Sequence, residues 1–136
     1  MKNILLLLSL IICTQSIAQK EVKVPTIAFK VPLGETITRG TVAITLAEIL
    51  EDSRCPSDVT CVWAGRAKVK VLVAIDGKET EEQIVLFERG KQTVIATTEG
   101  CVFKAMKLAP YPTAATKNNL AYELLVSEVC NISEEE

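Results

Sequence analysis

The chain of 136 residues contains no histidine. This absence removes the commonest general base, the usual serine and cysteine triads, and most zinc and copper sites. No Cys-x-x-Cys pair is present either, so thiol exchange of the thioredoxin kind has no support. Lysine and arginine (15) are fewer than aspartate and glutamate (17), and phosphate binding requires clustered cations. We therefore expect a protein that is not an enzyme, uses no cofactor and no metal, and does not bind nucleic acid.

The chain also lacks a hydrophobic run long enough to span a bilayer near its start. The apolar run from Ile4 to Ile12 has nine residues, far below the roughly 20 that a membrane helix needs. A lysine precedes it, and the small-x-small pattern Ser16-Ile17-Ala18 follows it, which predicts a signal peptide at residues 1–18. Lipid attachment at Cys13 is disfavoured because the residue before it is isoleucine rather than a small residue. We expect an exported protein, periplasmic or extracellular, with no stable membrane span.

Residues 19–136 are a normal size for one domain, and the run Glu134 to Glu136 predicts an acidic, solvated C-terminal tail. An even number of cysteines in an exported chain indicates disulfides. The four that follow the signal peptide are Cys55, Cys61, Cys101 and Cys130. They allow three pairings, and the spacing favours a short loop from Cys55 to Cys61 and a bridge from Cys101 to Cys130 across a hairpin.

The alternation of apolar and polar residues predicts an all-β domain. Period two is clear at Val42 to Leu46 and at Ala67 to Ile75, and Asp76-Gly77 fits a tight hairpin turn into the next strand, residues 79–87. Further strands are expected at residues 92–97, 101–108 and 120–129. Seven or eight short strands joined by glycine, proline and aspartate turns favour a single antiparallel β-sandwich resembling an immunoglobulin domain. A small closed barrel is the alternative.

If Cys101 faces Cys130, the register of the last two strands is fixed. Antiparallel pairing then places Phe103 opposite Glu128, Ala105 opposite Val126, and Lys107 opposite Leu124. The bridge would lie on the same face of the last strand as Tyr122, Leu124 and Val126.

The most distinctive segment is Glu51 to Gly65, EDSRCPSDVTCVWAG, which contains two cysteines and the only tryptophan. Together with the Leu-x-Pro-Tyr-Pro segment at Leu108 to Pro112 and a final strand containing Tyr122, it resembles a family of small exported bacterial proteins. The shared patterns are DSRCPxxVxCVWAG and the later LxPYP. The family brings no assigned activity, so the resemblance implies export, disulfides and a single domain, and no functional residue is carried over.

A disulfide-closed loop at Cys55 to Gly65 favours a binding or structural module that contacts a protein, peptide or glycan, because prior ordering lowers the entropy cost of binding. The residues that we select as candidates for partner contact are Asp52, Arg54, Asp58, Trp63 and Tyr111. A binding loop should protrude with Arg54 exposed. The alternative function is a secreted protease inhibitor that presents Ser53, Arg54 and Cys55 in an extended segment. A third is a carboxylate-based hydrolase.

Each of these features also has a simpler structural interpretation. Trp63 is more typical of a core residue that covers the adjacent disulfide than of a ligand platform. Arg54 can pair with Asp52 or Asp58, and calcium binding by Glu51, Asp52 and Asp58 lacks the spacing of a known loop. The basic stripe of Arg66, Lys68 and Lys70 suits a solvated outer face, and Pro110-Tyr111-Pro112 suits a stiff turn.

Overall fold

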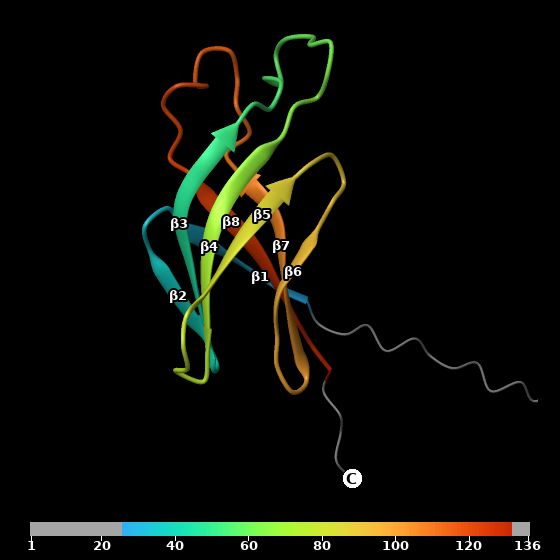
Figure 1. Ribbon diagram of the computed structural model, residues 1–136. Helices are drawn as coiled ribbons and strands as arrows, with labels where there is room; N and C mark the ends of the chain where they lie inside the picture. Colours follow the sequence, from blue (N-terminus) through green and yellow to red (C-terminus); the bar gives the residue numbers. More distant parts are fainter. Residues whose placement is uncertain (1–25, 132–136) are drawn as a thin grey trace, which may run out of the picture.

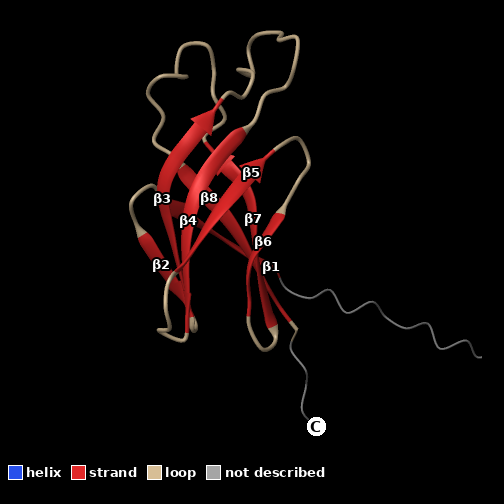
Figure 2. Cartoon of the chain, viewed as in Figure 1, coloured by secondary structure: helices blue, strands red, loops and turns tan. Residues whose placement is uncertain are grey.

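A computed structural model describes residues 26–131. These residues form two antiparallel four-stranded sheets and contain no helix (Figures 1 and 2), so the prediction of an all-β sandwich is confirmed. The signal peptide expected at 1–18, Cys13 and the acidic tail lie outside the described residues. The strands are β1 (Thr26–Pro32), β2 (Thr36–Arg39), β3 (Val42–Asp52), β4 (Ala67–Ile75), β5 (Glu81–Phe87), β6 (Thr93–Thr97), β7 (Cys101–Ala109) and β8 (Glu123–Cys130).

The strand order is nearly sequential in both sheets. One sheet has the order β1-β8-β7-β6 and the other has the order β2-β3-β4-β5. Within residues 26–131 no strand ladder joins the two sheets, so the closed-barrel alternative is not realised. The domain resembles an immunoglobulin domain in having two packed antiparallel sheets. The connections differ, because immunoglobulin strands are connected as Greek keys, whereas neighbouring strands within each sheet of this domain are connected mainly as meanders.

The core follows directly from the alternation in the sequence. In β4 every second residue is buried, from Ala67 to Val73, while Lys68 and Lys70 point to the outer face. The opposing sheet contributes Phe103, Ala105, Leu124 and Val126, all nearly or fully buried. Burial at about 25 cal/mol per Å² of apolar surface makes this inter-sheet layer the main stabilising term.

Three stretches of strand were not predicted. Strands β1 and β2 are edge strands that bury few residues, so their apolar pattern is weak, with Val31 the one buried residue of β1. Strand β3 continues six residues past Leu46. This part was not predicted because register shifts at Leu46/Glu48 and Ile49/Glu51 interrupt the alternation of buried and exposed residues. Strand β3 ends at Asp52, two residues before Arg54.

The predicted register of the last hairpin is correct in part. Cys101 faces Cys130, and Phe103 and Ala105 face Glu128 and Val126, as expected. Lys107 was expected opposite Leu124, and this is wrong: a register shift between Ala105 and Lys107 places Lys107 opposite Leu125. The extra residue on β7 is accommodated by a β-bulge, which no spacing rule in the sequence reveals.

Both predicted disulfides, Cys55–Cys61 and Cys101–Cys130, are formed. They lie at opposite ends of the sandwich: the first is in the β3–β4 loop, and the second joins the start of β7 to the end of β8. Two disulfides in one small domain indicate an oxidising, exported environment. Within residues 26–131 no helix has the length and hydrophobicity needed to cross a bilayer.

The long loops gather at one end of the molecule. The β3–β4, β5–β6 and β7–β8 connections all emerge at the top of Figure 1, at the far end from Cys101 and Cys130. At the other end the β4–β5 turn has positive φ at both Asp76 (54°) and Gly77 (65°), which is the conformation of the predicted tight turn. We call the upper end the loop end.

Candidate functional site

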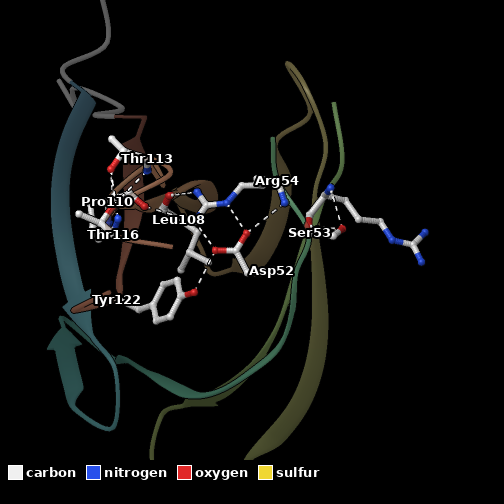
Figure 3. A network of polar contacts seen from close by, with 9 residues as sticks. Asp52, Ser53, Arg54, Leu108, Pro110, Thr113, Thr116 and Tyr122 are labelled. Carbon is white, nitrogen blue, oxygen red and sulfur yellow. Dashed lines mark hydrogen bonds and ion pairs between the residues drawn. The ribbon is translucent and has the colours of Figure 1, made fainter. Parts of the chain in front are cut away.

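A buried ion pair organises the loop end. Arg54 follows the last residues of β3 and is 6% exposed. Its Nε donates to Asp52 Oδ1 and its Nη2 donates to Asp52 Oδ2, both at 2.7 Å, so the two side chains form a bidentate pair (Figure 3). The planar guanidinium fits the carboxylate with two parallel hydrogen bonds, which is the strongest arrangement available to an ion pair.

The same guanidinium reaches across to the end of β7. Arg54 Nη1 donates to the carbonyl oxygen of Leu108 at 2.8 Å, and Nη2 donates to that of Pro110 at 3.2 Å. The guanidinium carbon also lies 5.1 Å from the centre of the Tyr111 ring, a cation–π contact. Arg54 thereby joins the β3–β4 loop to the β7–β8 loop, two segments more than 50 residues apart in the sequence. We call this set of contacts the Arg54 clasp.

Tyr122, the residue before β8, also contacts the Arg54 clasp. Its hydroxyl donates to Asp52 Oδ2 at 2.9 Å. Partial burial alone would raise the pKa of Asp52, but the hydrogen bonds from Arg54 and Tyr122 outweigh it and lower that pKa below its ordinary value. Burial, together with the bond to the carboxylate, raises the pKa of Tyr122. Near neutral pH Asp52 is therefore ionised and Tyr122 is protonated.

Backbone contacts fix the rest of the disulfide loop. Ser53 N donates to the carbonyl of Arg66 and Cys55 N to that of Ala64, so the two strands of the loop stay paired beyond the sheet. Gly65 has φ +68°, and a Cβ there would overlap the carbonyl oxygen of Ser53. Only glycine fits this close approach.

The disulfide loop also contacts the β7–β8 loop at its far side. Ser57 N donates to the carbonyl of Pro112 at 2.9 Å. The Asp58 carboxylate accepts a hydrogen bond from Ala114 N at 2.8 Å. Asp58 therefore does not pair with Arg54, which was one of the alternatives considered from the sequence, and Asp52 alone does.

The tip of the loop carries exposed apolar side chains. Trp63, one of the candidates for partner contact, is 80% exposed and Val62 is 90% exposed, so the simpler interpretation of Trp63 as a core residue that covers the disulfide is wrong. A shallow hollow is lined by Val59, Val62 and Trp63 together with both cysteines, Thr60, Ala64 and Arg89.

A more enclosed groove lies beside this hollow. Its volume is about 390 Å³, and it lies between the disulfide loop, the β5–β6 loop and the end of β7. Apolar side chains of Phe87, Met106 and Leu108 line it, with Tyr111 and Arg54 at the edge where the clasp begins. Arg89 and Ala64 line both the hollow and the groove, so the two form one continuous surface.

The buried position of Arg54 contradicts two of our expectations. A binding loop was expected to expose Arg54, and a protease inhibitor was expected to present Ser53-Arg54 to a protease cleft. Arg54 is instead 6% exposed and already donates to one carboxylate and two carbonyls. Arg54 could enter a protease pocket only by breaking these hydrogen bonds. The hypothesis of a protease inhibitor that presents Ser53, Arg54 and Cys55 is therefore wrong.

The proposed calcium ligands are not brought together. Asp52 binds Arg54, Asp58 binds the Ala114 amide, and Glu51 accepts hydrogen bonds from Ser53 and Arg66. Among residues 26–131 one group satisfies the spacing of a metal site, Cys101, Glu128 and Cys130, and its two sulfurs are joined in a disulfide. A disulfide has no thiolate to offer a metal.

The basic stripe lies on the outer face of its sheet, as expected. Arg66 and Lys68 pair with Glu51, and Lys70 pairs with Glu48 and Glu82 across the neighbouring strands. The hydrogen bonds from Ser53 and Arg66 lower the pKa of Glu51. Because these groups are well exposed, the pairs contribute little to stability.

Several residues of this surface were not among the predicted candidates. Val62, the neighbour of Trp63, was not selected as a candidate for partner contact. Nor were the groove residues Arg89, Lys91 and Lys107, because their segments were interpreted only as strands and turns. Strand parity offers a signal that could have found them. Strands β3, β4 and β5 run in alternating directions, so the connection that leaves β5 around Gly90 must lie at the same end as the β3–β4 loop.

Comparison of the chain with protein-family models, curated proteins and solved structures finds no match. The family resemblance drawn from the sequence motifs therefore stays a prediction.

Proposed function

We propose that this protein is an exported, non-enzymatic binding module, active in the periplasm or outside the cell, that contacts a protein, peptide or glycan through its loop end. The observation that carries the proposal is the exposure of Trp63 (80%) and Val62 (90%) at the tip of a loop that is closed by a disulfide. Exposing large apolar side chains to water is unfavourable, and covering them with a partner lowers the free energy of the system.

The rigidity of the loop supports the same proposal. The Arg54 clasp, the Cys55–Cys61 bridge and the backbone pairing of Cys55 with Ala64 all act on the segment that carries Trp63. A loop ordered before it binds loses less conformational entropy on association, so a larger share of the contact energy appears as affinity. In this proposal Asp52 and Arg54 position the loop, while Trp63, Tyr111 and Asp58 remain the exposed candidates for contact.

A catalytic function has less support from the groove. Glu88 is the one carboxylate among its lining residues, whereas glycoside hydrolysis uses two. Asp52, the nearest buried carboxylate of the clasp, is fully engaged by Arg54 and Tyr122. These contacts suit a group that holds structure rather than one that transfers a proton.

We also propose that the chain belongs to the family of small exported bacterial proteins that it resembles. The two shared segments, residues 52–65 and 108–112, meet in the Arg54 clasp, where Arg54 binds the carbonyls of Leu108 and Pro110. One structural unit therefore contains both motifs, and this explains why they would occur together.

Trp63 provides a direct test because it is the only tryptophan in the chain. The purified, oxidised protein is screened against a glycan array and a displayed peptide library, and each binder is titrated while the fluorescence of Trp63 is recorded. A partner that covers the loop tip should shift the emission to shorter wavelength, since it removes the indole from water.

The binders are then tested against matched variants. Val62→Ser with Trp63→Ser should weaken binding by at least about tenfold, as expected for apolar anchors. Ile84→Ser and Val94→Ser remove apolar side chains that are about half exposed (53% and 51%) from the outer faces of β5 and β6 and should leave affinity unchanged. The proposal fails if the loop variant binds every recovered ligand as tightly as the wild type does.

A further inference from the structure

The groove beside Trp63 combines an apolar floor with a basic rim. Phe87 and Leu108 are 8% and 3% exposed and form part of the floor. Arg89, Lys91 and Lys107 lie on the rim and are exposed. They come from the β5–β6 loop and from β7, so the fold places side chains from separate segments around one opening.

The three rim cations have no acidic partner. Within residues 26–131, Arg89, Lys91 and Lys107 form no ion pair. The cations that do form one are Arg54 at the edge of the groove and, elsewhere on the sandwich, Lys30, Arg39, Arg66, Lys68 and Lys70. Glu88 is the single carboxylate on the groove. The whole chain has a formal net charge of −2, so the groove has the opposite sign to the protein around it. Such a local field favours an anionic ligand.

The lining chemistry suits a polypeptide better than a sugar polymer. Apart from its cations and Tyr111, the groove offers sugar hydroxyls few hydrogen-bonding side chains, Gln92 and Glu88. The floor is apolar instead, and a volume of about 390 Å³ accommodates one or two large side chains. Arg89 lines both the groove and the hollow around Trp63, so an extended segment lying in one would continue over the other.

We propose that the groove binds an acidic peptide segment of a partner protein, with an apolar side chain on the Phe87–Leu108 floor and neighbouring carboxylates on Arg89, Lys91 and Lys107. The inference rests on the proposed function and names the ligand class for its binding surface. The apolar contact supplies affinity, and the three cations select the sign of the flanking charge.

The experiment uses fluorescein-labelled short peptides and the intact oxidised protein. One peptide alternates glutamate with leucine, a second alternates lysine with leucine, and a third alternates serine with leucine. Fluorescence anisotropy should show that the glutamate peptide binds most tightly, and that its affinity falls by about tenfold as salt rises from about 0.05 to 0.5 M, because salt screens exposed charges. Equal binding of the three peptides would overturn the inference.

Charge reversal on the rim supplies the second measurement. Lys91→Glu with Lys107→Glu should weaken the glutamate peptide by about tenfold or more and should strengthen the lysine peptide. Lys78→Glu with Lys104→Glu makes the same change of net charge at residues that do not line the groove, and it should have little effect. Far-ultraviolet circular dichroism confirms that both variants are folded. Similar losses in the two variants would show a non-specific charge effect and would refute the site.

The outcomes separate this inference from the proposed function. If the glutamate peptide binds the Val62→Ser, Trp63→Ser variant as tightly as the wild type, the groove is a peptide site and the role of the loop tip is wrong. If screened ligands shift Trp63 emission but no acidic peptide binds, the loop function stands and the groove inference fails. Binding to phosphatidylglycerol vesicles in place of peptides would assign the basic rim to a lipid surface and would also overturn it.

Discussion

Replacing Arg54 by methionine should be among the most destabilising single changes in this protein. The substitution removes every donor to Asp52 except Tyr122 and the Arg54 amide, and Asp52's side chain is only 10% exposed. It also leaves the carbonyls of Leu108 and Pro110 without their partner. Removing one member of a buried ion pair costs about 3–5 kcal/mol, because the other charge remains buried and unpaired. A small domain has about 5–15 kcal/mol of total stability.

The measurement is urea unfolding of the oxidised protein, followed by far-ultraviolet circular dichroism. Tryptophan fluorescence is unsuitable because Trp63 is already 80% exposed in the folded state. Lys30→Met is the matched control: its ion pair with Glu123 is equally short, 2.8 Å, but the side chains are 63% and 34% exposed, so the expected loss is about 0–1 kcal/mol. Equal losses in the two variants would refute the claim that burial makes the clasp important.

Arg54→Lys refines this test. Lysine keeps the positive charge but cannot make the bidentate contact with Asp52 and reach two carbonyls at the same time. It should therefore recover only part of the free energy of unfolding that Arg54→Met loses. Full recovery would mean that charge alone, and not the planar fork of the guanidinium, holds the two loops together.

Three further results are expected from unfolding measurements. Gly65→Ala should lower the melting temperature more than Gly77→Ala does, because both glycines have positive φ but only at Gly65 would a Cβ meet the backbone of Ser53. Folding lowers the pKa of Asp52 below its ordinary value of 3.8. The ionised carboxylate therefore stabilises the protein fully above that pH, and this stabilisation is lost as the pH falls through the folded-state pKa. Asp52→Asn should flatten the decrease in the free energy of unfolding between about pH 5 and pH 2. Serine at both ends of the Cys101–Cys130 bridge should cost about 3.5 kcal/mol, against about 2 for the shorter bridge at the loop end.

The sequence predicts the fold well where one face of a strand is buried and the period is unbroken. The stretch Ala67 to Ile75 and the turn at Asp76-Gly77 are examples, since each depends on local residues alone. Prediction fails at the edge strand β1, whose side chains are mostly exposed, and at the bulge after Ala105, where one inserted residue changes the register. A bulge is favoured by the packing of the finished sheet, and that packing is not visible in a local pattern.

The candidate site could be predicted less well, because its contacts are long-range. The importance of the Glu51 to Gly65 segment was visible in its composition, and so was the pairing of its cysteines. The burial of Arg54 depends on Leu108, Pro110 and Tyr111, which approach it only after both sheets have formed. The sequence left open whether Trp63 is a core or a contact residue and whether Arg54 is exposed or paired with an aspartate; in the structure Trp63 is 80% exposed and Arg54 is 6% exposed.

The position of the Cys101–Cys130 bridge has a mechanical consequence. It joins the last residue of β8 to the first residue of β7, so tension applied to the chain beyond Asn131 passes through the sulfur–sulfur bond to Cys101 and on toward the β6–β7 turn. The hairpin between the two cysteines then bears no load. With a sequence separation of 29 residues, about 100 Å of chain cannot be drawn out while the bond is intact. A molecule pulled from this end would keep the β7–β8 loop, and with it the far half of the Arg54 clasp, out of the path of the force.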